Sequence, residues 1–140
     1  MDGQKSTLRA LCEPGIESTL GFAPWTVILR AEGRVIGWGG LSIDPFVPGL
    51  GVEVSYYFDS RDWGRGYATE LVTVSIHYGF DTVRLPAIQA FARPENVASV
   101  RVLEKCGLTF LRYEPELERN HYEIRCSSWT QSCRDSGAGT

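Results

Sequence analysis

Hydrophobic and polar positions alternate along the first half of the chain with the period of β-strands. Residues 25–31, 34–43 and 51–58 are rich in β-branched and aromatic side chains, which predicts three strands. The turn residues Glu32 and Gly33 separate the first two, so these strands are expected to form a hairpin. Glycines at positions 37, 39 and 40 predict a bulge or a close backbone approach in the second strand.

The second half of the chain alternates between helical and strand periods. Residues 67–80 repeat small or apolar side chains at helical spacing, and residues 87–92 read as a short buried strand. Asn96 suits the N-cap of a following helix, and Gly107 suits the position just after its end. Residues 109–113 and 121–129 predict a final hairpin.

The remaining segments are less regular. Residues 6–12 are compatible with a short strand or the start of a helix, and residues 44–49 contain two prolines and predict a loop. Residues 131–140 are small and polar, which predicts a disordered tail. We therefore expect one α/β (α+β) domain over residues 1–130, with a mixed sheet and helices on both of its faces.

Composition excludes several classes of protein. A chain of 140 residues with 43% hydrophobic content can bury one core, and a net charge of −3 argues against a nucleic-acid partner. No apolar run reaches the roughly 20 residues that span a bilayer, and the first residues do not resemble a signal peptide. Four cysteines without CxxC spacing and two histidines argue against a metal site, so we expect free thiols in a cytoplasmic protein.

The strongest chemical signal lies between the third strand and the first helix. Its sequence is Arg61-Asp62-Trp63-Gly64-Arg65-Gly66-Tyr67-Ala68. A glycine-rich turn at a helix start directs backbone N–H groups toward an anion, and Gly64 and Gly66 leave room for phosphate oxygens. Arg61 and Arg65 add positive charge. The turn lacks the Gly-Lys-Ser/Thr of P-loops and the third glycine of dinucleotide-binding folds.

A second segment contains Asn96-x-x-Ser99 and Val102-Leu103-Glu104-Lys105-Cys106-Gly107. Together with Arg61-x-x-Gly64-x-Gly66, it resembles the GNAT superfamily of N-acetyltransferases, in the branch that includes ribosomal-protein N-terminal acetyltransferases. The resemblance spans about residues 25–129. It implies a twisted, mostly antiparallel sheet in which strands 51–58 and 87–92 splay apart, with acetyl-CoA as co-substrate and its pantetheine arm in the gap.

The resemblance also implies residue roles. The expected cofactor-binding residues are Tyr56, Tyr57, Phe58, Arg61, Trp63, Gly64, Arg65, Gly66, Tyr67, Ala68, Asn96 and Ser99. Glu53 is the expected base, because an amine with a pKa of about 10 must lose a proton before it attacks. Ser99 is expected to assist the leaving thiolate. Each has a structural alternative, since Glu53 could face solvent and Ser99 could bond the start of its helix.

Two departures from the family pattern affect the predicted function. Leu103 occupies a position where many members carry a tyrosine, and the segment before Trp25 is too short for the family's two acceptor-side helices. We therefore expect a shortened N-terminal region and a homodimer that uses the N-terminal segment or the hairpin of residues 109–129.

Two functions stay open from the sequence. The first is transfer of an acetyl group from acetyl-CoA to a primary amine, either a peptide or protein N-terminus or a small amine. The second is a non-catalytic acyl-CoA-binding module that serves as a sensor or subunit. Other polar and aromatic residues are expected to be structural. His121 starts a strand whose edge could face the acceptor site. Cys106 is expected to be a small buried residue.

Overall fold

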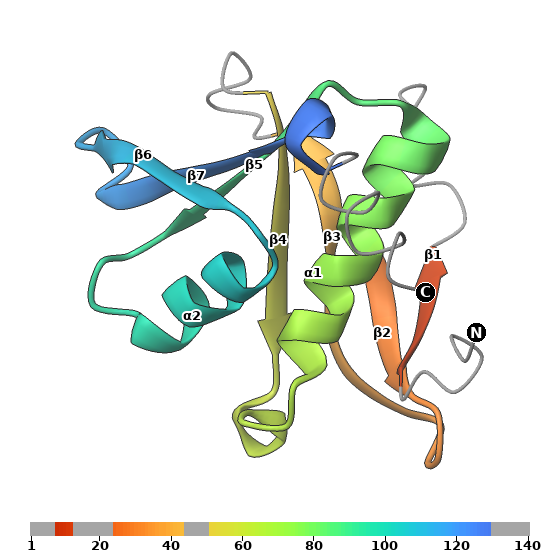
Figure 1. Cartoon of the computed structure of the whole chain (residues 1–140). Coiled ribbons are helices and arrows are strands. Elements are labelled where there is room, and N and C mark those ends of the chain that lie inside the picture. Colours follow the sequence, from red (N-terminus) through yellow and green to blue (C-terminus); the bar gives the residue numbers. More distant parts are fainter. Residues whose placement is uncertain (1–7, 13–23, 44–50, 130–140) are drawn as a thin grey trace, which may run out of the picture.

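A computed structural model describes residues 8–12, 24–43 and 51–129. Its centre is a seven-stranded sheet in the order β1-β2-β3-β4-β5-β7-β6 (Figure 1). The strands are β1 (Leu8–Cys12), β2 (Trp25–Leu29), β3 (Arg34–Ile43), β4 (Val52–Phe58), β5 (Ala87–Ala92), β6 (Thr109–Glu114) and β7 (Arg119–Arg125). All neighbours are antiparallel except β4 and β5. The predicted mixed, mostly antiparallel sheet is confirmed, and residues 6–12 contain a strand.

Strands β4 and β5 separate along their length. Only Glu53 and Gln89 are paired between them, and beyond this point β5 continues its pairing with β7 alone. Figure 1 shows the two strands meeting at the Glu53 end and diverging toward the end of β4, with helix α2 (Val97–Lys105) beside the opening. The splay implied by the resemblance is therefore confirmed.

Helix α1 (Tyr67–Tyr78) covers the sheet through the side chains that helical spacing had predicted. Val72 and Ile76 pack with Leu41 and Val54, and α2 adds Leu103 to the same buried cluster. Each such side chain contributes about 1.5–3 kcal/mol by leaving water. One core shared by both helices places α1 and α2 on the same face (Figure 1). The sequence had predicted helices on both faces of the sheet. Within the described residues, neither α1 nor α2 lies on the opposite face.

The glycines of β3 produce both features expected of them. The β2–β3 register shifts between Val27 and Ile28, which is a bulge. A Cβ on Gly39 would lie 2.6 Å from the Ser55 carbonyl oxygen, and one on Gly37 would overlap the Tyr57 carbonyl. Glycine therefore allows β3 and β4 to stay in register at these positions.

Several predicted boundaries were wrong by a few residues. Strand β2 ends at Leu29, because the N–H groups of Glu32 and Gly33 both bond the Leu29 carbonyl and close the turn early. A π-helical turn, η4 (Gly79–Val83), follows α1. Residues 126–129 are helical rather than extended, since the Trp129 ring packs 5.1 Å from that of Phe80. The predicted loop at 44–49 and tail at 131–140 lie outside the described residues.

Candidate acyl-CoA site

A loop after β4 presents backbone N–H groups at the start of α1. Gly64 and Gly66 have φ angles of 78° and 83°, and a Cβ on either would have nothing within 4 Å. The first hydrogen bond of α1 runs from the Glu70 N–H to the Gly66 carbonyl at 3.1 Å. The N–H groups of Tyr67 and Ala68 precede it, so helix geometry gives them no acceptor inside the helix. This arrangement suits an anion such as a pyrophosphate.

A partly buried ion pair ties this loop to the β2–β3 hairpin. Asp62, which ends the short 3-10 helix η3 (Ser60–Asp62), is 4% exposed. The two terminal nitrogens of the Arg34 guanidinium donate to the Asp62 carboxylate at 3.1 and 3.2 Å, and its Nε donates to Glu32 at 3.0 Å. The hydrogen bonds from Arg34 lower the pKa of Asp62 and outweigh the opposing effect of burial. Sequence reasoning missed this pair because its members lie far apart in the chain.

Other expected loop residues gather at the same place. The Asp59 carboxylate accepts from the Arg61 N–H at 3.1 Å and caps η3. The Trp63 indole N–H donates to the Phe58 carbonyl at 2.9 Å, which fixes an exposed ring to the end of β4. Tyr67 packs against Phe58 with ring centroids 6.4 Å apart. Together, these contacts hold the loop against the strand from which it leaves.

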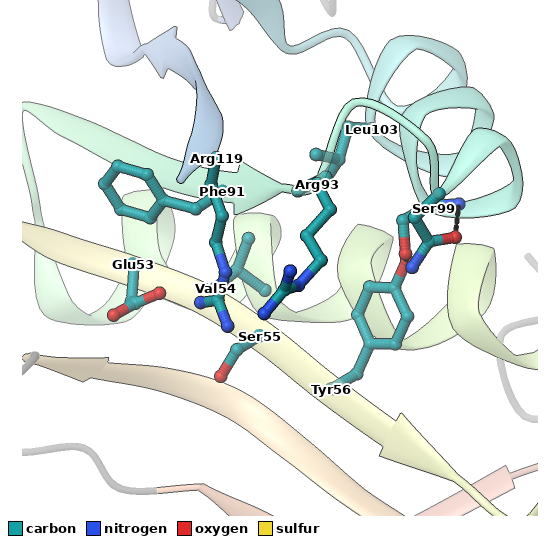
Figure 2. A pocket seen from close by; sticks show the side chains of 11 residues that line it. Glu53, Val54, Ser55, Tyr56, Phe91, Arg93, Ser99, Leu103 and Arg119 are labelled. Atoms are coloured by element: carbon teal, nitrogen blue, oxygen red, sulfur yellow. Dashed lines mark hydrogen bonds between the residues drawn. The ribbon is translucent and has the colours of Figure 1, made fainter. Parts of the chain in front are cut away.

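A cavity of about 240 Å³ lies at the splay between β4 and β5 (Figure 2). It is lined by Glu53, Val54, Ser55, Tyr56, Phe91, Ala92, Arg93, Asn96, Ser99, Leu103 and Arg119. Four of the residues predicted from separate motifs, Glu53, Tyr56, Asn96 and Ser99, therefore meet at one site. Tyr57 does not: its ring stacks on Trp38 and is exposed elsewhere, beside a second, open groove.

Two hydrogen bonds between residues that line the cavity connect β4 to α2. The Tyr56 hydroxyl donates to Ser99 Oγ at 3.0 Å (Figure 2). The Ser99 N–H donates to Asn96 Oδ1 at 3.2 Å, so Asn96 is the predicted N-cap. Burial raises the pKa of Tyr56, which keeps the phenol neutral at physiological pH. The sequence had suggested only a main-chain role for Tyr56, because the position of α2 over β4 is a tertiary feature.

Two arginines in the cavity were also missed. Arg93 follows β5 and Arg119 begins β7, and both side chains point toward β4 near Val54 and Ser55 (Figure 2). Arg93 begins the segment that contains Asn96 and Ser99, but the sequence predicted no role for either arginine, and only the pairing of β5 with β7 brings them together.

His121 does not face an open acceptor site. It is 4% exposed, with Nδ1 2.7 Å from Glu114 Oε2 and Nε2 2.6 Å from Gln89 Oε1. Cys106 is half-buried, lies 3.6 Å from the Thr73 hydroxyl, and has a pKa raised by burial. Across residues 8–12, 24–43 and 51–129, we find neither a cluster of metal-ligating side chains nor a helix long and apolar enough to span a bilayer.

Comparison with known proteins identifies the family of this chain. Residues 5–109 match the model of the acetyltransferase (GNAT) domain. The chain is 33% identical to the N-acetyltransferase p20 of Bacillus licheniformis over 79 residues, which is 56% of this chain and 44% of that protein. An Agrobacterium tumefaciens acetyltransferase structure superposes with a TM-score of 0.65 and 27% identity, covering 74% of this chain and 60% of the other.

A further structure shares the fold. It is the ribosomal-protein-S5-alanine acetyltransferase of Vibrio fischeri, with a TM-score of 0.62, 24% identity, and coverage of 76% and 62% of the two chains. This chain thus spans about half the length of the curated relative and three fifths of the solved structures. The family model covers most of its residues. The chain therefore belongs to the GNAT acetyltransferase family.

Proposed function

We propose that the protein transfers the acetyl group of acetyl-CoA to a primary amine. The observation that carries the proposal is the meeting of Glu53, Tyr56 and Ser99 around one cavity at the splay of β4 and β5. The amine nitrogen forms a bond to the thioester carbon, the carbon–sulfur bond breaks, and CoA leaves as a thiol. Membership of the GNAT family supports acetyl-CoA as donor and an amine as acceptor.

The cofactor would lie along the opening between the two strands. Its pyrophosphate would bind the N–H groups between Arg61 and Ala68, where Gly64 and Gly66 leave open space. Its pantetheine arm would pair with the β4 main chain at Tyr56–Phe58, which has no β5 partner. The thioester would then reach the cavity beside Ser99.

Glu53 would take the proton that the ammonium form of the amine must lose. It lines the cavity and is only partly exposed, at the point where β4 and β5 are still paired. The proton passes from nitrogen to the carboxylate, directly or through water, and then to solvent.

Ser99 and Tyr56 would stabilise the leaving thiolate by hydrogen bonding. Tyr56 donates to Ser99 Oγ, which leaves the serine proton available for sulfur. A thiol has a pKa of about 8.5 and a phenol about 10. Because burial raises the pKa of Tyr56 further, full proton transfer from it would be uphill. The pair therefore supplies a hydrogen bond in place of the tyrosine that Leu103 replaces.

Thiol release from acetyl-CoA across a panel of amines tests this function. Glu53→Gln should lower kcat by about 10²- to 10⁴-fold with little change in CoA affinity, because it removes the proton acceptor alone. Glu116→Gln, an exposed residue of the β6–β7 turn, is the matched control. A wild-type protein that binds CoA but acetylates none of the amines would support the alternative of a non-catalytic acyl-CoA-binding module.

We also propose that the protein acts in the cytoplasm as a homodimer. Support for the dimer comes from β6, an edge strand of the sheet that exposes the apolar side chains of Phe110, Leu111 and Tyr113. Edge strands of this kind are normally covered. Support for the compartment comes from Cys106 and Cys126, neither of which forms a disulfide with a described residue.

A further inference from the structure

Arg93 and Arg119 occupy neighbouring positions in the sheet. Ala92 and Asn120 form the last pair between β5 and β7, so the two arginines stand one step beyond it. The alternation of side chains places them on the same face as Phe91 and His121. Both arginines are exposed, and both line the cavity that contains Glu53 (Figure 2).

This placement brings two like charges to neighbouring positions of the sheet. Like charges at neighbouring cross-strand positions are destabilising. Among the described residues, no carboxylate or hydrogen-bond acceptor is recorded against either guanidinium. For comparison, Arg112 on β6 pairs with Glu114, and Arg125 on β7 pairs with Glu123. The two cavity arginines are therefore available to a ligand.

The anionic part of CoA does not explain this charge. The cavity contains no residue of the 59–66 loop, which offers its own N–H groups and the arginines 61 and 65. The pantetheine arm that would enter the cavity is uncharged. The anion that Arg93 and Arg119 suit must then belong to the second substrate.

We propose that the acceptor is a primary amine that carries a carboxylate a few bonds from its nitrogen, as in an amino acid. The inference rests on the function proposed above. The amine would face Glu53 and the carboxylate would face Arg93 and Arg119, whose planar guanidinium groups suit a carboxylate. The cavity volume of about 240 Å³ is below that of pockets for drug-sized ligands, which fits a small charged head group.

Calorimetric titration of the CoA-loaded protein at pH 7 tests the proposal without requiring turnover. The probes are β-alanine and β-alaninamide, which share the ammonium and differ in the carboxylate. We expect β-alanine to bind about 10- to 100-fold more tightly, the range given by one charge-assisted hydrogen-bonded contact. Arg93→Gln and Arg119→Gln should each remove most of this preference. Arg125→Gln, on the same strand as Arg119 but paired with Glu123, should keep it.

A second arm identifies the source of the carboxylate. A short peptide that begins with Asp is compared with one that begins with Asn, because an acidic N-terminal residue carries the same two groups. A preference for the acid in either pair, lost in the Arg93 and Arg119 variants, supports the proposal.

Three results would overturn the proposal. The first is that both acids bind no more tightly than their amide counterparts, and the second is that no probe binds at millimolar concentration. The third is a preference for the acid that survives in both arginine variants. An arginine-dependent preference without acetyl transfer would support the acceptor assignment and contradict the catalytic function.

Discussion

At the scale of single residues, glycine in the left-handed region determines the shape of the loop of residues 59–66. We call it the phosphate loop because we propose that it binds the pyrophosphate of CoA. Gly64 and Gly66 reach φ angles that side chains with a Cβ rarely adopt, and the space beside each is open. A side chain at either position would strain the backbone and fill the open space in which we propose that the phosphate oxygens bind. This explains why both positions of the motif are glycine.

Gly64→Val should therefore abolish CoA binding and leave the fold largely intact. The expected cost in the free energy of unfolding is about 1–2 kcal/mol, from the left-handed backbone alone. Gly107→Val is the control, because Gly107 has a φ of 96° in the turn after α2 and so adds comparable backbone strain. Calorimetry with CoA and thermal denaturation separate the two effects. Equal CoA binding by the wild type and the Gly64 variant would place the pyrophosphate elsewhere.

The Tyr56–Ser99 hydrogen bond is a second residue-scale feature. If Tyr56 acts through Ser99, Tyr56→Phe and Ser99→Ala should each lower kcat about 2- to 10-fold, the value of one hydrogen bond. The double variant should lose little more than Ser99→Ala, because both changes interrupt one chain. Steady-state kinetics of the four proteins measures the coupling. Fully additive losses would show that the two hydroxyls act independently.

At the scale of elements, the Arg34–Asp62 pair joins the phosphate loop to the hairpin of β2 and β3. The carboxylate is buried inside a loop that is expected to bind an anion, so its charge must be neutralised for the loop to function. Arg34 does this through its guanidinium and does not use the N–H groups at the start of α1, which are the proposed phosphate ligands. The hairpin therefore supports the candidate site although it lines neither the loop nor the cavity.

Acid should weaken this link. The pKa of Asp62 is lowered in the folded protein, so its stabilisation is complete above the ordinary aspartate pKa of about 3.9 and is lost as the pH falls through the lower folded value. Thermal denaturation of the wild type and of Asp62→Asn from pH 7 to pH 2 measures the stabilisation that the ionised Asp62 contributes. The advantage of the wild type should be constant down to about pH 4 and shrink below that. An advantage that grows on acidification would contradict the assignment.

At the scale of the whole molecule, an exposed apolar edge on β6 suggests assembly. Light scattering over a dilution series should report a dimer at micromolar concentration. Phe110→Lys should shift it toward the monomer, because a charge on the edge strand opposes pairing. Val74→Lys changes an exposed apolar position on α1 and is the control; it should leave the dimer unchanged. A stable, active wild-type monomer at this concentration would rule out the dimer.

The sequence by itself determined the strands, the two helices and the phosphate loop. These features depend on local signals, namely the alternation of residues 51–58, the helical spacing of residues 67–80, and the glycines at 64 and 66. Each signal acts within a few residues of the backbone that it shapes. The family resemblance added the splay of β4 and β5, which the structure confirms. It also added the roles of Glu53 and Ser99; both residues line one cavity, and their roles stay predictions.

Only the tertiary structure decided which side chains meet across the chain. Tyr56 bonds a serine 43 residues away, and Arg34 bonds an aspartate 28 residues away. Arg93 and Arg119 become neighbours through strand pairing, and residues 126–129 turn helical where Trp129 packs against Phe80. Both helices share one face for the same reason. Such contacts depend on how distant elements pack, and no local periodicity of the sequence specifies that packing.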